Sequence, residues 1–174
     1  MQIKLVVDEH EIQLGWEALG SLIDSLPDED ESLADLFHDL AQSNIATVRA
    51  AVASKAVISE ETVANLASDP SPEVIEALLC AQCRKLSESA LTHIIQRNWS
   101  EVNRRIAQTV EGYYQSDITA VAKLLAGSAD PSVRAALASN GDAPKLVLRQ
   151  LLKDPDPEVR RLAQNTLNTL STRY

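Results

Sequence analysis

The strongest pattern in the sequence is a long-period repeat of aliphatic positions. Five valines anchor it, separated by 26, 28, 31 and 26 residues: Val48, Val74, Val102, Val133 and Val159. Eight residues before each anchor stands a large aliphatic residue, in order Leu40, Leu66, Ile94, Leu125 and Leu151. Four residues after each anchor stands another apolar residue, in order Val52, Leu78, Ile106, Leu137 and Ala163. A repeat of this length is typical of stacked structural units, so we expect five copies.

Each repeat is predicted to contain two short helices. Three anchors have a proline two residues earlier, which suits the first turn of a helix because its missing N–H would have no partner there: Pro72, Pro131 and Pro157. The residues before these prolines are then N-caps of the second helix: Ser71, Asp130 and Asp156. The first helices are expected to begin near Ser59, Ser87, Asp117 and Asp142.

The helix pairs are expected to stack. A pair of helices this short cannot bury its own apolar stripe, whereas stacked neighbours can. The six aromatic residues and five glycines among 174 residues, with abundant Ala and Leu, also favour helices over sheets. The predicted fold is therefore all-α, an α-α superhelix or solenoid of about five helix pairs over residues 31–174.

Residues 1–30 do not follow the repeat. Apolar residues alternate with polar ones from Ile3 to Val7 and again from Ile12 to Trp16, which predicts a small β-hairpin, with a helix as the alternative. Later apolar residues have helical spacing as far as the proline at position 27: Leu19, Leu22, Ile23 and Leu26. A two-stranded hairpin is marginally stable alone, so we expect it to lean on the first repeat within a small N-terminal cap.

Charge is distributed unevenly along the chain. The formal net charge is −9, from 25 acidic and 16 basic side chains. Residues 1–45 carry eleven acidic side chains and one Lys, including the run Asp28–Glu31, whereas residues 46–174 carry fourteen acidic and fifteen basic ones. The acidic run is either a solvated loop or an acidic docking site. The overall sign makes nucleic acid an unfavoured partner.

Several functional signals are missing from the sequence. No apolar run approaches the roughly 18 residues that would span a bilayer, and the N-terminus lacks the basic start of a signal peptide. There is no Gly-rich phosphate loop, G-x-S-x-G elbow or H-E-x-x-H motif, and the three histidines lack metal-ligand spacing. We therefore expect a cytoplasmic protein with no membrane contact, cofactor or metal, and no residue pattern indicates an enzyme.

Cys80 and Cys83 form a C-x-x-C pattern. Two ligands are at most half of a structural zinc site, and no second cysteine pair completes it. The pair falls within a predicted helix rather than at a helix start, where the thiol pKa would be lowered. We interpret both as reduced, structural cysteines, with a redox or metal role as the alternative.

The turns and second helices resemble HEAT-like repeats. The stretches DPSPEVIEALL, ADPSVRAALASN and DPDPEVRRLAQN are most similar to the leucine-rich repeat variant branch of bacterial α-solenoids, and the resemblance covers about residues 31–170. Solenoids of this kind serve as protein-binding scaffolds, as parts of lyases and as DNA glycosylases. The resemblance therefore implies a fold more than a function.

Arginine follows the anchor valine in three copies: Arg49, Arg134 and Arg160. The preceding turns supply aspartates: Asp69, Asp130 and Asp154. A residue after the anchor lies on the flank of the second helix, between repeats, where a guanidinium can bridge turn carboxylates and carbonyls. The HEAT-like resemblance implies ladders of this kind. We therefore interpret these residues as a structural Asp/Arg ladder rather than a ligand-binding row of cations.

The second helices also have a face opposite the core. If the anchor and the residues three, four and seven positions later point inward, the residues two and six positions later point outward. The resemblance implies that second helices line the concave surface of the solenoid. Six outward residues form a candidate binding surface, the contact strip: Glu76, Arg104, Gln108, Ser139, Arg161 and Asn165. An ordinary solvated helix face is the alternative.

The third copy departs from the others. Trp99 stands in its turn in place of the proline pattern, and the exit VEGYYQSD lengthens the repeat. Trp and Tyr are frequent in binding hot spots, so Trp99, Tyr113 and Tyr114 form a second candidate site. Packing between unequal repeats is the alternative for all three.

The sequence favours a non-catalytic protein–protein interaction module with an unknown protein partner. One rival hypothesis is a HEAT-like DNA-repair glycosylase, in which arginines near Trp99 would grip a phosphate backbone: Arg104, Arg105 and Arg161. The net charge and the lack of a long basic run oppose this rival. A lyase-type repeat protein is a second rival, which the sequence does not rank.

Overall fold

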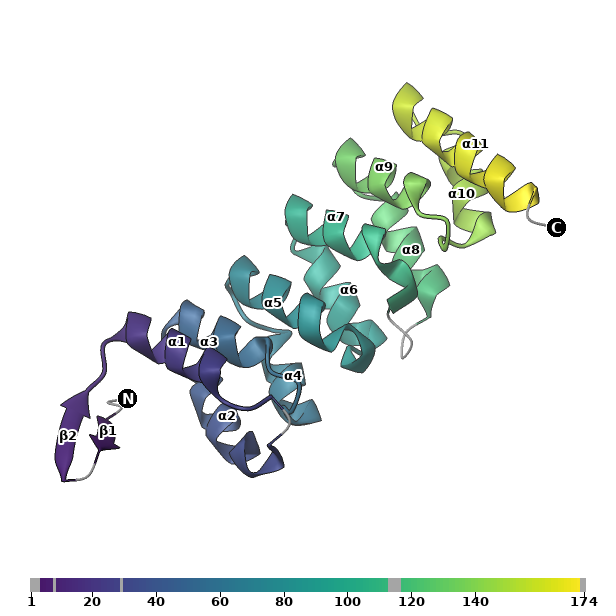
Figure 1. The fold of residues 1–174 in the computed structure, drawn as a ribbon. Helices are drawn as coiled ribbons and strands as arrows, with labels where there is room; N and C mark the ends of the chain where they lie inside the picture. Colours follow the sequence, from purple (N-terminus) through teal and green to yellow (C-terminus); the bar gives the residue numbers. More distant parts are fainter. Residues whose placement is uncertain (1–3, 8, 29, 113–116, 173–174) are drawn as a thin grey trace. The chain divides into compact units, whose positions relative to one another are not determined.

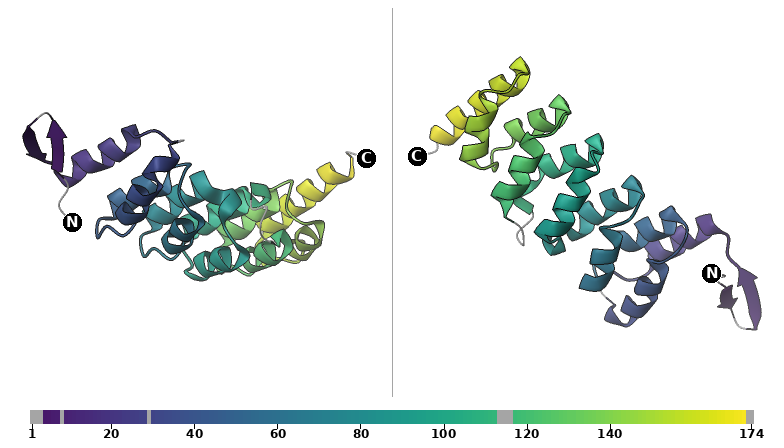
Figure 2. Two further views of the ribbon diagram at one scale, coloured as in Figure 1. Left: turned by 90° about the horizontal axis from the view of Figure 1, so that it is seen from below. Right: turned by 180° about the vertical axis from the view of Figure 1, so that it is seen from behind.

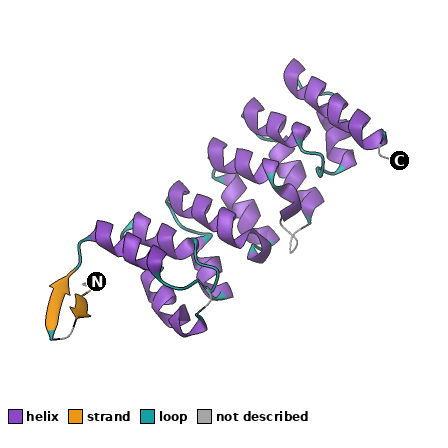
Figure 3. Ribbon diagram, viewed as in Figure 1, coloured by secondary structure: helices purple, strands orange, loops and turns teal. Residues whose placement is uncertain are grey.

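A computed structural model of the chain describes residues 4–7, 9–28, 30–112 and 117–172 (Figure 1). The chain divides into two compact parts, residues 1–82 (unit 1) and residues 83–174 (unit 2). Among the described residues, strands are confined to one hairpin near the N-terminus, and the other regular elements are helices (Figure 3). The predicted all-α class is therefore confirmed, and we describe each unit separately.

An antiparallel β-hairpin comes first in unit 1. Strand β1 (Lys4–Val7) pairs with strand β2 (His10–Gln13), as one of the two sequence interpretations predicted. The second strand is shorter than predicted, because Trp16 already begins helix α1 (Trp16–Ser25). The hairpin extends away from the helices of unit 1 in every view (Figure 1, Figure 2). The expectation that it leans on the first repeat is therefore wrong.

Unit 1 has two predicted repeats and a capping helix. The helices are α2 (Ala34–Leu40), which follows the 3-10 helix η1 (Glu31–Leu33), α3 (Ala46–Ala53), α4 (Glu60–Leu66) and α5 (Pro72–Gln82). Helix α2 packs against α3, and α4 packs against α5, as two helix pairs require. The second helices α3 and α5 pack side by side, and α1 packs against the other side of α3. Helix α1, rather than the hairpin, therefore covers the first repeat.

The described residues of unit 2 form three helix pairs. Its first helices are α6 (Glu88–Gln96), α8 (Ile118–Ala126) and α10 (Lys145–Leu151), and its second helices are α7 (Ser100–Gln108), α9 (Pro131–Ser139) and α11 (Pro157–Ser171). Two 3-10 helices are η2 (Cys83–Lys85) and η3 (Val110–Gly112). Helix α8 packs against α6 and α10, and α9 packs against α7 and α11. The unit therefore has one row of first helices and one row of second helices (Figure 1).

The anchors and the apolar positions eight residues before and four residues after them form the core of both units. The predicted inward positions three and seven residues after the anchor do not all face the core, because Arg105, Ala81 and Thr109 are exposed. The five anchor valines are at most 1% exposed, and the apolar residues eight positions before and four positions after them are at most 2% exposed. Removal of apolar surface from water is the main favourable contribution to folding. The repeat register inferred from the sequence is therefore confirmed in each unit.

The predicted helix starts are confirmed with one exception. Helices α5, α9 and α11 begin at their prolines, and the carboxylates of Asp130 and Asp156 accept hydrogen bonds from backbone N–H groups of the first turn. The first helices α4, α6 and α8 have the predicted caps Ser59, Ser87 and Asp117. Asp142 is not a cap, because α10 begins only at Lys145. The proline at position 144 disfavours helical geometry at the residue before it, and this delays the helix.

The turn of the third repeat has its own construction. Asn98 has a φ of 57°, in the left-handed region that Asn tolerates better than most residues. Trp99 then occupies the N-cap position of α7 without a side-chain cap hydrogen bond. Behind the turn, the buried amide of Asn103 donates to the carbonyl oxygen of Ile95 at 3.0 Å. Asn103 therefore fastens this turn from the position that carries arginine in three other repeats.

Lys55 joins the end of α1 to the first repeat. Its side chain is 3% exposed, and Nζ donates to the carbonyl oxygens of Asp24 and Leu26 at 3.1 and 2.9 Å and to the Asp28 carboxylate at 2.9 Å. Carbonyls at the C-terminal end of a helix lack donors within the helix, so the ammonium group satisfies them. Part of the acidic run therefore has a structural role, which the sequence pattern did not indicate.

Candidate interaction surface

An ion pair links the two repeats of unit 1. Arg49 of α3 donates from Nε and Nη2 to the Asp69 carboxylate at 2.5 and 3.0 Å, and from Nη1 to the carbonyl oxygen of Ser43 at 2.7 Å. The arginine and aspartate side chains are 12% and 5% exposed. The hydrogen bond that Arg49 donates to the Asp69 carboxylate raises the pKa of Arg49 above its usual value. The guanidinium is therefore occupied on three sides and is not offered to a ligand.

The same arrangement recurs in unit 2. Arg134 of α9 donates from Nε and Nη2 to the Asp154 carboxylate at 2.8 and 3.0 Å, and from Nη1 to the carbonyl oxygen of Ser128 at 2.8 Å. These side chains are 10% and 4% exposed. The hydrogen bond between them raises the pKa of Arg134 and lowers the pKa of Asp154. Bidentate pairs of this kind fix orientation as well as distance, so they set how neighbouring repeats stack.

The register of the ladder differs from the sequence expectation. The carboxylate comes from the turn of the following repeat, while the preceding turn supplies backbone carbonyls. The prediction that Asp130 is a carboxylate of the Asp/Arg ladder is wrong, because its side chain caps helix α9. Arg160 donates to the carbonyl oxygens of Asp154 and Pro155 at 2.6 and 2.9 Å. A signal in the sequence could have indicated this register, because Asp69 and Asp154 each follow the paired arginine by 20 residues.

The structure places most of the contact strip at the surface. Gln108, Ser139, Arg161 and Asn165 of unit 2 are exposed, whereas Arg104 is half-buried. In unit 1, Glu76 is half-buried on α5. Two strip arginines make ion pairs one helical turn away, Arg104 with Glu101 and Arg161 with Glu158. The strip in unit 2 therefore consists of neutral amides and hydroxyls between locally balanced charges.

A small hollow brings two strip residues together. Ser139 at the end of α9 and Asn165 of α11 line a cavity of about 180 Å³ with Gly141 and Thr166. In unit 1, a wider hollow of about 500 Å³ lies over α1 and α3, with Glu73 of α5 at its edge. Each unit therefore has a depression along its second helices, lined in both cases by small and polar side chains.

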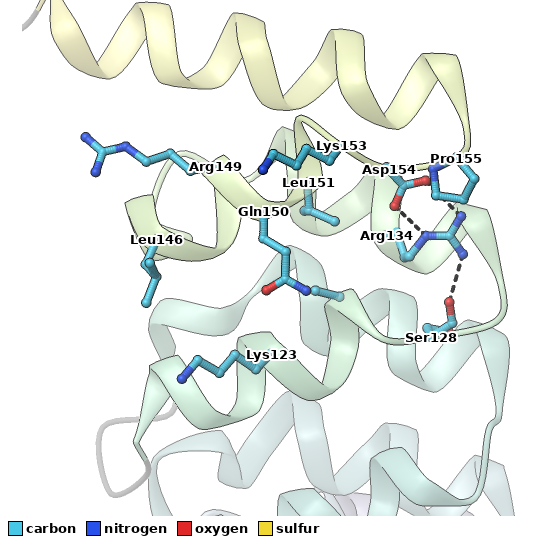
Figure 4. Close-up of a pocket in the computed structure, with 11 residues that line it drawn as sticks. Lys123, Ser128, Arg134, Leu146, Arg149, Gln150, Leu151, Lys153, Asp154 and Pro155 are labelled. Atoms are coloured by element: carbon cyan, nitrogen blue, oxygen red, sulfur yellow. Dashed lines mark hydrogen bonds and ion pairs between the residues drawn. The ribbon is translucent and has the colours of Figure 1, made fainter.

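A larger groove lies on the other side of unit 2, along the first helices. It has a volume of about 770 Å³ and lies between α8 and α10 (Figure 4). The charged residues at its edge are Lys123, Arg149 and Lys153, and Leu146 is 61% exposed beside them. Sequence reasoning missed this groove because it concentrated on the second helices.

The aromatic candidate is only partly described. Trp99 is half-buried at the start of α7, and the guanidinium carbon of Arg97 lies 4.9 Å from the centre of its ring. This is a cation–π contact within one turn, which favours a packing role for this tryptophan. Tyr113 and Tyr114 lie outside the described residues.

The cysteines and the possible metal ligands can be located among the described residues. No group of three or more His, Cys, Asp or Glu side chains among them could hold a metal ion. Cys80 lies exposed in α5, whereas Cys83 begins η2 and so is not in the α-helix that the sequence predicted for both. Within the same residues, no helix has the length and apolar character needed to cross a lipid bilayer.

Comparison with known families matches one segment of the chain. The HEAT repeat family matches residues 147–174, a segment that contains most of α10 and all of α11. Searches of curated proteins and of solved structures give no significant match to this chain. The matched segment is the last helix pair of unit 2, with the turn that carries Asp154 and Asp156. The match therefore supports HEAT-like repeats, on the same turn and second helix that carry the resemblance in the sequence.

Proposed function

We propose that this chain is a non-catalytic protein–protein interaction module built on HEAT-like repeats. The observation that carries the proposal is the stack of helix pairs in unit 2, of which the last pair matches the HEAT repeat family. Stacked repeats offer side chains at regular spacing on an extended surface, which suits a protein partner. Closer kinship with the leucine-rich repeat variant branch and a cytoplasmic location stay predictions, as does the division into an acidic cap over residues 1–30 and repeats over residues 31–174.

The contact strip is the surface that we propose for the main partner. Its members in unit 2 come from the second helices α7, α9 and α11, which pack in one row. With the described residues, Arg104 and Arg161 form ion pairs at the surface, with Glu101 and Glu158. Such pairs contribute little to stability, so a partner carboxylate can replace the present one at small cost. Amide and hydroxyl groups between them add hydrogen-bonding capacity.

A double charge reversal tests the strip. We expect Arg104→Glu combined with Arg161→Glu to reduce retention of a partner captured from native cytosol by about tenfold, because the change creates like-charge contacts at the interface. The measurement is quantitative affinity capture, with circular dichroism to show that helicity is unchanged.

The matched control reverses two other cations of unit 2. Arg105 and Lys145 are exposed, and Arg105→Glu combined with Lys145→Glu changes the net charge equally. This control is expected to retain the partner. Full retention by the Arg104/Arg161 variant would remove the strip as the binding surface and direct attention to Trp99.

A further inference from the structure

The groove between α8 and α10 combines a defined shape with a rigid end. Lys123 lies on the α8 side, and Leu146, Arg149 and Gln150 lie on the α10 side (Figure 4). The buried pair of Arg134 and Asp154 lies at the end of the groove near the turns. Because this pair is bidentate and nearly excluded from water, the turn that carries it is fixed in position. One end of the groove is therefore held in place by the contact between the last two repeats.

Three cations at the groove lack an anionic partner. The side chains of Lys123, Arg149 and Lys153 form no ion pair or hydrogen bond with the described residues. The surrounding stretch, residues 118–154, contains five basic residues and three acidic ones, although the whole chain has a net charge of −9. Of these acidic residues, Asp130 and Asp142 do not line the groove, and Asp154, which does, is paired with Arg134. The groove therefore has a local positive charge that the rest of unit 2 does not neutralise within it.

The groove also has an apolar component. Leu146 is 61% exposed, whereas the other leucines of its repeat are buried or half-buried, and Leu151 lines the groove from its core position. The aliphatic stems of Lys123 and Arg149 add apolar surface while their charged ends remain in water. An occupant that places an apolar side chain against Leu146 and carboxylates near the cations would match both components.

We propose that this groove binds an acidic, leucine-containing peptide segment of a partner protein. Carboxylates of the segment pair with Lys123, Arg149 and Lys153, and a leucine side chain packs on Leu146. At physiological salt the Debye length is about 8 Å, so these nearby cations outweigh the distant acidic residues of the chain. This surface is independent of the contact strip, because it is formed by first helices and their turns.

The groove favours a peptide over nucleic acid. Binding of single-stranded nucleic acid relies on aromatic side chains that stack on bases, and none of the described residues that line the groove is aromatic. Three cations around a leucine also form too short a basic surface for a duplex, whose affinity depends on many phosphate contacts. Phosphate pairing leaves the exposed Leu146 uncovered, whereas an apolar side chain of a peptide covers it.

The test uses the full chain and labelled synthetic peptides in fluorescence anisotropy. A peptide of repeating Glu-Glu-Leu units is expected to bind, and its affinity is expected to fall about tenfold between roughly 50 mM and 300 mM salt because the attraction is screened. A Glu-Glu-Ser peptide, which keeps the charge and lacks the apolar side chain, is expected to bind at least fivefold more weakly, in about the range that loss of a partly buried leucine implies. A Lys-Lys-Leu peptide is expected not to bind.

Single variants locate the binding to the groove. Arg149→Glu and Leu146→Ser are each expected to weaken binding of the Glu-Glu-Leu peptide about fivefold to tenfold. Their matched controls are Arg105→Glu, an exposed arginine on α7, and Leu36→Ser, a leucine on α2 that is 43% exposed. Both controls, and the double variant of the contact strip, are expected to bind like the unmodified chain.

Several results would overturn the proposal. The first is that the Glu-Glu-Leu peptide does not bind at millimolar concentration. The second is that the Glu-Glu-Ser peptide binds as tightly as the Glu-Glu-Leu peptide. The third is that Arg149→Glu and Arg105→Glu lose the same affinity for the Glu-Glu-Leu peptide. Tighter binding of a mixed-sequence single-stranded oligodeoxynucleotide would assign the groove to nucleic acid instead. Self-association that Arg149→Glu abolishes, measured by sedimentation, would assign it to a second copy of this chain. If the unmodified chain does not bind the Glu-Glu-Leu peptide but still captures the partner of the contact strip, the groove proposal is wrong and the proposed function stands.

Discussion

At the scale of single residues, buried cations determine how neighbouring elements are joined. Arg49 and Arg134 each bind a carboxylate of the next repeat and a carbonyl of their own turn, and Lys55 binds carbonyls at the end of α1. A buried pair contributes little net stability compared with apolar residues, yet removal of one partner leaves the other charge unsatisfied. These residues therefore specify geometry more than they add stability.

The Arg134–Asp154 pair predicts a dependence of stability on pH. The hydrogen bond from Arg134 lowers the pKa of Asp154 in the folded state, whereas the unfolded chain has a pKa of about 3.9. The folded state therefore binds fewer protons in this range, and stability rises with pH. The contribution of Asp154 is fully present above the unfolded pKa and is lost as pH falls through the lowered folded pKa.

Replacement of this carboxylate tests the effect. We expect Asp154→Asn to lower the free energy of unfolding at pH 7 by about 2 kcal/mol, because the buried guanidinium loses a charged partner. The loss should shrink as the pH falls below the unfolded pKa of about 3.9 and through the lowered folded pKa, because Asp154 of the unmodified chain then becomes protonated. The measurement is urea unfolding over a pH series. A constant difference between the two proteins at every pH would contradict the assigned role, and Asp142→Asn, at an exposed position, controls for removal of a charge in general.

At the scale of helices, the repeat pattern separates positions that face the core from positions that face water. Val133 is fully buried in α9, whereas Ser139, six residues later, is exposed. We expect Val133→Asp to cost about 3 kcal/mol or more, because it buries an unpaired carboxylate between helices. Ser139→Asp should cost less than about 0.5 kcal/mol, as surface substitutions usually do. Thermal unfolding followed by circular dichroism compares the two, and equal shifts would show that the inward and outward assignment is wrong.

The helix pairs could be predicted because burial repeats with the chain. Each anchor valine and its partners lie at fixed separations, and this period is visible in one sequence. The start of α10 was harder to predict, because Asp142 is a suitable cap residue and only the following proline moves the start to Lys145. The hairpin was predicted as an element, whereas its direction away from the helices depends on a loop that has no sequence signature.

The candidate sites were less predictable than the helices. Outward positions on second helices follow from helical periodicity, so the exposure of Gln108 and Asn165 could be anticipated. The groove depends on the space between α8 and α10, two helices whose separation the sequence does not reveal. Lys123 and Arg149 are 26 residues apart and are ordinary surface cations in the sequence. Only the packing of first helices shows that both line one groove.

At the scale of the whole chain, the two units differ in charge. Residues 1–82 carry 16 acidic and 3 basic side chains, a net charge of −13, whereas residues 83–174 carry 9 acidic and 13 basic ones, a net charge of +4. These values sum to the total of −9. The net charge of the whole chain therefore describes neither unit. A charged partner that is attracted to one unit is repelled by the other.

This distribution predicts that the chain does not retain double-stranded DNA. The basic unit has four net charges and pairs several of its arginines internally, while the acidic unit repels phosphates wherever it approaches them. Each phosphate contact that a protein makes releases counterions and steepens the loss of affinity with salt, so a chain with few free cations should bind weakly even at low salt. We expect no measurable retention in a gel-shift assay at about 0.15 M salt. Micromolar binding with a steep salt dependence, or excision of a modified base, would favour the DNA-repair glycosylase over the interaction module. If a weak affinity for DNA remains at low salt and Arg149→Glu abolishes it, the DNA contact lies in the groove of unit 2, because that variant leaves the contact strip unchanged.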